Sequence, residues 1–110
     1  MPDSYSKALE VAEAAALAAG EMLRNEFHHA GGPRGGHGKA PAEVDAEQLI
    51  RRRLLDAFPG YSYLGEETGR QSGIKDDTHI WLVDPNDGTD SYLKGLRGSA
   101  VSIALLRSLE

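Results

Sequence analysis

The sequence predicts an α+β fold in which two N-terminal helices pack on a mainly antiparallel sheet. In the first part of the chain, two segments carry apolar side chains at spacings of three and four, which is the helical period. A glycine- and proline-rich stretch separates these two segments. Beyond residue 60 the period changes, and short apolar runs typical of strands alternate with polar segments that contain glycine.

The first expected helix covers residues 4–28. Its predicted buried stripe consists mostly of small side chains, namely Leu9, Ala12, Ala16, Ala19, Leu23 and Phe27. Strong helix formers fill most of the other positions. Because small residues dominate the stripe, we expect this helix to pack closely against another element.

Residues 30–41 are predicted to form a loop, because they contain five glycines and two prolines in twelve positions. The loop does not match the phosphate-binding motif GxxxxGK[ST]. Pro33 stands in place of its first glycine, and Ala40 stands in place of its final serine or threonine.

The second expected helix covers residues 42–58, and Pro59-Gly60 ends it. One face is predicted to be buried, with Ala46, Ile50, Leu54, Ala57 and Phe58 along it. The run Arg51–Arg53 lies in the middle of this helix. Three consecutive helical positions point in different directions, so we interpret the run as a solvated part of the surface rather than one basic patch.

Three strands are expected near residues 61–65, 79–84 and 99–106. The middle one contains the continuous apolar run Ile80–Val83, which is typical of a buried strand. The last one shows alternating apolar side chains. Residues 68–78 are polar and contain two glycines, so we expect a loop there.

Composition excludes several classes of function. The 110 residues fit a single domain, spanning 1–110, and carry 12 basic and 17 acidic side chains, a net charge of −5. This charge argues against a nucleic-acid partner or a partner membrane. The absence of cysteine excludes disulfides and thiolate chemistry. No apolar run approaches the length of a membrane span and no secretory signal is visible, so we expect a cytoplasmic protein.

Two acidic segments directly follow predicted strands. Glu66 and Glu67 follow the first strand, and the segment Asp84–Asp90 follows the second. If these strands are neighbours, Glu66, Asp84 and Asp87 could supply the oxygen ligands that Mg²⁺ prefers. The alternative is that Asp-Pro and Asn-Asp-Gly form an ordinary turn between two strands.

The string WLVDPNDGTDSYLKGLRGSAVSIALL, from Trp81 to Leu106, resembles the signature of the inositol monophosphatase family. These are Mg²⁺-dependent, lithium-sensitive phosphatases of sugar and nucleotide phosphates. The matching features are an apolar strand, the motif Asp-Pro-x-Asp-Gly-Thr and an aromatic residue, Tyr92. Upstream, Leu64–Glu67 is similar to the family's Gly-Glu-Glu element, and Ala46–Glu47 to its second helix. The resemblance implies the N-terminal part of the layered sugar-phosphatase fold.

The resemblance also implies a Mg²⁺ site. Glu66 matches a metal-binding glutamate that helps to activate the attacking water, and Asp84 matches a carboxylate shared between two metal ions. Asn86 stands where the family uses a backbone carbonyl as ligand. Asp87 matches a ligand of the second metal.

Gly88 and Thr89 match the family's phosphate-binding turn, and the Thr89 hydroxyl would orient the water. The implied catalytic residues are therefore Glu66 and Thr89. The implied substrate is a phosphorylated small molecule, either a sugar phosphate or a nucleotide phosphate.

Two departures from the family pattern accompany these matches. The family's Asp-x-Val-Thr-x-x-Asp segment falls on His37, Lys39, Ala40 and Glu43, where only Glu43 keeps an acidic side chain. The family's catalytic domain also continues beyond residue 110 and supplies a further metal-binding aspartate there. We therefore expect a single partial domain that is inactive or weakly active alone. The alternative is a non-catalytic module that retains the truncated fold and self-associates as a homodimer or larger assembly.

Overall fold

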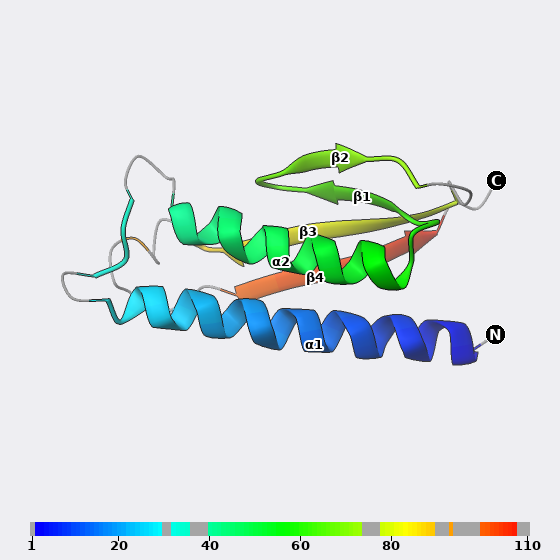
Figure 1. Ribbon diagram of the computed structural model, residues 1–110, viewed down its shortest axis with the longest axis horizontal. Coiled ribbons are helices and arrows are strands. Elements are labelled where there is room, and N and C mark those ends of the chain that lie inside the picture. Colours follow the sequence, from blue (N-terminus) through cyan, green and yellow to red (C-terminus); the bar gives the residue numbers. More distant parts are fainter. Residues whose placement is uncertain are drawn as a thin grey trace.

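The computed structural model describes residues 2–29, 32–35, 40–73, 78–89, 93 and 100–107. Within these residues, two helices precede a four-stranded sheet. Their bounds are α1 (Pro2–Phe27), α2 (Pro41–Ala57), β1 (Ser62–Gly65), β2 (Gly69–Gln71), β3 (His79–Asp87) and β4 (Ala100–Arg107). The helices lie side by side against the sheet (Figure 1), with α2 over β1 and β3 and α1 beside β4. The predicted fold class is confirmed.

The sheet is mixed, with strand order β2-β1-β3-β4. The outer pairings, β1 with β2 and β3 with β4, are antiparallel. The central pairing of β1 with β3 is parallel, and its register places Gly65 opposite Val83. Because parallel strands end at the same edge of a sheet, the segments that follow β1 and β3 emerge next to each other.

The loop predicted over 68–78 contains a strand, so this prediction was wrong for Gly69–Gln71. All three residues of β2 are exposed at the edge of the sheet, and they carry no alternating apolar pattern that could reveal them. The predicted strand 79–84 also extends further, to Asp87. Ser99, the expected first residue of the last strand, lies outside the described residues.

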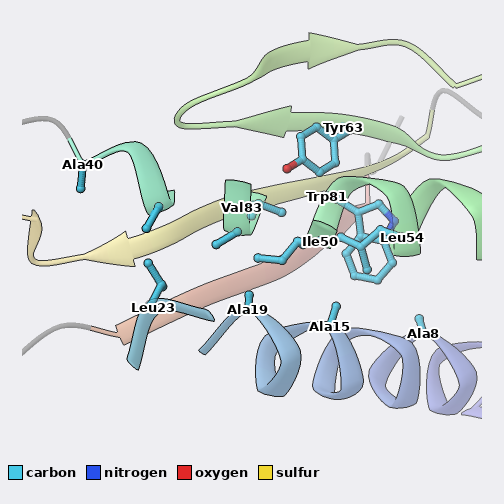
Figure 2. Packing of buried hydrophobic residues seen from close by; sticks show 12 residues of the cluster. Ala8, Ala15, Ala19, Leu23, Ala40, Ile50, Leu54, Tyr63, Trp81 and Val83 are labelled. Atoms are coloured by element: carbon cyan, nitrogen blue, oxygen red, sulfur yellow. The ribbon is translucent and has the colours of Figure 1, made fainter. Parts of the chain in front are cut away.

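The hydrophobic core lies between the helices and one face of the sheet (Figure 2). Strand alternation directs Tyr63, Trp81 and Val83 towards α2, where Ile50 and Leu54 are fully buried. The contribution of α1 is mostly alanine: Ala8, Ala15 and Ala19 are buried, together with Leu23. Small side chains allow α1 to approach its neighbours closely.

The buried stripe of α1 differs from the predicted one. Leu9 is 60% exposed, whereas its neighbour Ala8 is only 3% exposed. In a helix rich in alanine, several stripes have similar hydrophobicity, and the close contact with α2 favours the one with the smallest side chains. On α2, the predicted buried face was wrong for Ala57, which is exposed.

The opposite face of the sheet is less covered. Leu64 and Leu106, on alternate positions from the core residues, are 40% and 49% exposed. Among the described residues, no helix is both long and apolar enough to cross a membrane.

Candidate active site at the carboxyl ends of β1 and β3

The parallel pairing of β1 and β3 brings the two acidic segments together. The backbone N–H of Glu66 donates a hydrogen bond of 3.0 Å to the carbonyl of Val83, so the chain stays beside β3 for one residue beyond β1. Glu66 therefore lies next to Asp84. The condition set by the sequence, that the two strands be neighbours, is met.

The Asp-Pro-Asn-Asp segment is not a simple turn, because it belongs to β3 and contains an irregularity. The register of β3 against β4 shifts between Asp84 and Asp87, which face Ser102 and Ala100 respectively. A bulge of this kind re-aims side chains at the end of a strand. Within this bulge, the N–H of Asn86 donates a hydrogen bond of 3.1 Å to Asp84 Oδ1.

The turn that follows β3 requires glycine. Gly88 has φ of +112°, a conformation that residues with a Cβ rarely adopt. It is followed by Thr89, whose hydroxyl oxygen lies 3.2 Å from the carbonyl oxygen of Asn86. The backbone thus turns sharply enough to place the threonine hydroxyl back over the strand end.

Glu43, in the first turn of α2, connects this segment to the helix. Its side chain is buried, and it accepts hydrogen bonds from Asn86 Nδ2 at 2.8 Å and from the Thr89 hydroxyl at 3.1 Å. Burial raises the pKa of Glu43, and the nearby charges of Asp84 and Glu66 raise it further, against the opposing effect of the two hydrogen bonds. In the sequence, Glu43 was singled out only as the one acidic side chain kept where the family has its Asp-x-Val-Thr-x-x-Asp segment.

Glu47, one turn further along α2, holds the turn that follows β1. Its buried carboxylate accepts hydrogen bonds from the backbone N–H groups of Glu67, at 2.7 Å, and Thr68, at 2.9 Å, and from the Thr68 hydroxyl. Burial and the neighbouring Glu47 carboxylate raise the pKa of Tyr63. The sequence analysis did not identify Glu47 as the residue that holds the turn after β1.

Arg51 lies on the same side of α2 as Glu43 and Glu47. The interpretation of the run Arg51–Arg53 as solvated surface was wrong for this residue. Its guanidinium donates to the Thr68 carbonyl and hydroxyl, both at 2.9 Å, and to Gln71 Oε1 at 2.7 Å. It also lies 5.0 Å from the centre of the Tyr63 ring. Arg52 and Arg53 are exposed, as expected for a solvated surface, but Arg51 is half-buried and bound.

The sequence contains a pattern that could have revealed the roles of Glu43, Glu47 and Arg51. Glu43, Glu47 and Arg51 recur every four residues beside the apolar stripe of Ala46, Ile50 and Leu54. Charged side chains next to a buried stripe need hydrogen-bonding partners, which indicates that polar loops pack against that part of the helix.

Several carboxylates lie close together at the candidate site. Desolvation raises the pKa of Glu67, and the carboxylates of Glu43, Glu47, Glu66 and Asp84 raise it further. Like charges gathered in this way repel one another, and the donor set consists of oxygens, as hard cations such as Mg²⁺ prefer. Within the described part of the chain, however, no three aspartate, glutamate or histidine side chains converge closely enough to hold a metal ion.

The predicted site residues have different degrees of exposure. Asn86 is buried, with its side chain directed at Glu43, and Asp84, Gly88 and Thr89 are half-buried. Glu66 and Asp87 are exposed to solvent. Three further residues that the family resemblance covers lie outside the described residues, namely His37, Lys39 and Tyr92.

Comparison with known proteins identifies the family. A sequence model described as the inositol monophosphatase family matches residues 4–109. The chain belongs to the inositol monophosphatase family. The resemblance predicted from the Asp-Pro-x-Asp-Gly-Thr motif is thereby confirmed, and enzymes of this family depend on Mg²⁺.

Relatives support this assignment in sequence and in structure. An inositol-1-monophosphatase from Mesorhizobium japonicum is 40% identical over 109 residues, covering 93% of this chain and 40% of the relative. Inositol monophosphatase 1 of Solanum lycopersicum is 37% identical, covering 93% of this chain and 39% of the relative. The crystal structure of the suhB protein from Bartonella henselae superposes with a TM-score of 0.80 at 33% identity, covering 92% of this chain and 40% of the other.

These inositol monophosphatase relatives are considerably longer than the present chain. The chain spans about 40% of the length of the relatives that it matches over most of its own length. It aligns with their N-terminal part.

Proposed function

We propose that this chain forms the N-terminal, metal- and phosphate-binding part of a Mg²⁺-dependent phosphomonoesterase. The observation that carries the proposal is the parallel pairing of β1 and β3, which sets Glu66 next to Asp84. The chain aligns with only part of its relatives, and the family resemblance implies a further metal-binding aspartate beyond residue 110. We therefore expect little or no hydrolysis by the chain alone.

The ligands in this proposal are the carboxylates of Glu66, Asp84 and Asp87 and the backbone carbonyl of Asn86. Mg²⁺ held by these residues would lower the pKa of a water molecule and would neutralise charge on the phosphate and on the leaving oxygen. Exposure of Glu66 and Asp87 to solvent leaves their carboxylates accessible to a cation.

Thr89 and Gly88 have separate roles in this proposal. When the Thr89 hydroxyl donates a hydrogen bond to Glu43, its oxygen can accept a hydrogen bond from the attacking water and so orient it. Gly88, which has no side chain and a positive φ, lets a phosphate approach the backbone. The proposed substrate is a phosphorylated small molecule, a sugar or nucleotide phosphate.

Titration calorimetry with Mg²⁺ on the 110-residue chain tests the metal site. We expect binding at millimolar Mg²⁺ that weakens by at least about tenfold in Asp84→Asn and in Glu66→Gln, because each change removes a charged ligand. Asp56→Asn, which neutralises an exposed carboxylate on α2 outside the proposed ligand set, is the matched control and should bind as wild type. Absence of binding to the wild-type chain would contradict the proposal.

Hydrolysis of a sugar phosphate by the same samples tests the expectation about activity. We expect turnover close to the buffer background with and without Mg²⁺. Substantial Mg²⁺-dependent turnover that Asp84→Asn abolishes would show that this chain is sufficient for catalysis.

The second candidate function is a non-catalytic module that self-associates. It is favoured by β4, an eight-residue strand that stands last in the strand order and exposes Leu106. Such an edge can pair with the same edge of another copy. Sedimentation velocity is expected to show a dimer that Leu106→Lys weakens and Leu17→Lys, on the exposed side of α1, does not. A monomer at all concentrations would contradict this candidate.

A further inference from the structure

The polar side of α2 links the helix to both segments of the candidate site. Glu43 holds the end of β3, whereas Glu47 and Arg51 hold the turn after β1. The ligand proposed on that turn, Glu66, is itself exposed. Its position must therefore be set by the backbone on either side of it.

Glu47 joins that backbone to α2. It accepts hydrogen bonds from the N–H groups of the two residues that directly follow Glu66, at 2.7 Å from Glu67 and 2.9 Å from Thr68. A fully buried carboxylate is stable only when donors surround it, so Glu47 and the turn are each satisfied by the other.

Gly65, the residue before Glu66, also depends on Glu47. A Cβ built at Gly65 would collide with the Glu47 carboxylate and with the Tyr63 ring. The end of β1 thus passes directly against Glu47, and the absence of a side chain at position 65 makes this approach possible.

Thr68 extends the contact to Arg51. Its hydroxyl donates to Glu47 and accepts from the Arg51 guanidinium, which also binds the Thr68 carbonyl. The short turn is therefore fixed at one end to β3, through Glu66 N–H to Val83, and at the other end to α2, through Glu47 and Arg51.

We propose that Glu47 is a positioning residue that fixes the turn 66–68 and thereby keeps Glu66 beside Asp84. This inference rests on the proposed function for the role of Glu66 as a ligand. Glu47 does not touch the metal or the substrate in this arrangement. It acts through the backbone of Glu67 and Thr68, and residues that orient ligands in this way typically change metal affinity by about 10- to 100-fold.

The decisive variant is Glu47→Gln, because it keeps the size of the side chain and replaces one acceptor oxygen with an N–H₂ group that faces N–H donors. In metal-free protein, we expect the amide protons of Glu67 and Thr68 to lose their carboxylate-bonded chemical shifts. Their hydrogen exchange should accelerate by at least about tenfold, while exchange in the centre of α2 at Ile50 stays unchanged. Asp56→Asn is the matched control and should leave all three amides unchanged.

The second measurement is Mg²⁺ affinity by calorimetry, for which we expect Glu47→Gln to weaken binding by about tenfold or more. Unchanged exchange at Glu67 and Thr68, or Mg²⁺ affinity equal to wild type, would overturn the proposal. If wild type binds no Mg²⁺, the proposed function fails, and the exchange measurement alone decides whether Glu47 fixes the turn. If Glu47→Gln does not fold, Thr68→Val removes the hydroxyl that donates to Glu47 and should give the same changes at a smaller size.

Discussion

Helices α1 and α2 pack against each other and against the same sheet, yet their inward sides have different chemistry. The buried residues of α1 are mainly alanines, and they contribute close packing. The inward side of α2 combines the apolar Ile50 and Leu54 with the buried carboxylates of Glu43 and Glu47. Of these two helices, α2 is the one whose described side chains connect the core directly to the segments that follow β1 and β3.

Two buried glutamates, one on each helix, show the same contrast in electrostatic terms. Glu26, near the end of α1, pairs with Arg34 at 2.7 Å and also accepts from its backbone N–H at 2.9 Å. The hydrogen bonds from Arg34 lower the pKa of Glu26 to about 2. Glu43 is bound by the uncharged donors of Asn86 and Thr89, and burial raises its pKa. Negative charge is compensated at the end of α1 and accumulates at the candidate site.

The largest expected effect comes from removing an apolar contact of α2. Ile50→Ala, at a fully buried position, should lower the free energy of unfolding by about 3 kcal/mol through lost burial and a residual cavity. Leu17→Ala on α1 truncates a side chain that is 77% exposed and should change the free energy of unfolding by less than about 0.5 kcal/mol. Urea unfolding of both variants measures the difference. Equal effects would contradict the burial described for the two helices.

A pair of glycine substitutions should have effects of opposite sign in the two regions. Gly65→Ala forces a Cβ against Glu47 and Tyr63 and should destabilise the fold by about 2 kcal/mol. Gly20→Ala, inside α1 where the new Cβ meets no atom within 4 Å apart from its chain neighbours and the adjoining helix backbone, should stabilise the fold by about 0.5–1 kcal/mol. Thermal unfolding distinguishes the two signs. Stabilisation by Gly65→Ala would show that Glu47 does not press on the end of β1.

The smallest expected effect concerns pH and the ion pair at the end of α1. Because the folded pKa of Glu26 lies near 2, below the value of 4.5 for a free glutamate, its ionised form stabilises the folded state above about pH 4.5. This contribution is lost as the pH falls from 4.5 towards 2. The stability difference between wild type and Glu26→Gln should therefore be constant near neutral pH and shrink in that window, as followed by urea unfolding at several pH values. A difference that grows on acidification would contradict the Glu26–Arg34 pairing.

Much of the fold could be predicted from local patterns. The helical period, Pro59-Gly60 and the apolar run Ile80–Val83 indicate the main elements, because each pattern reflects burial on one side of a regular backbone. Strand β2 could not be found in this way, since its three residues are exposed and pair with β1 through the backbone without an apolar pattern. Leu9 was placed wrongly because the alanines of α1 leave the orientation of that helix undetermined by hydrophobicity.

The candidate site divides in the same way. The motif from Asp84 to Thr89 is contiguous, so the sequence by itself determined which residue types gather there and, through the resemblance, the family. The tertiary structure decided that β1 and β3 run parallel, which sets Glu66 beside Asp84. It also decided that Glu47 and Arg51 hold the turn after β1. Those contacts join residues far apart in the chain, and their hydrogen bonds form only when packing of the core brings α2 against the strand ends.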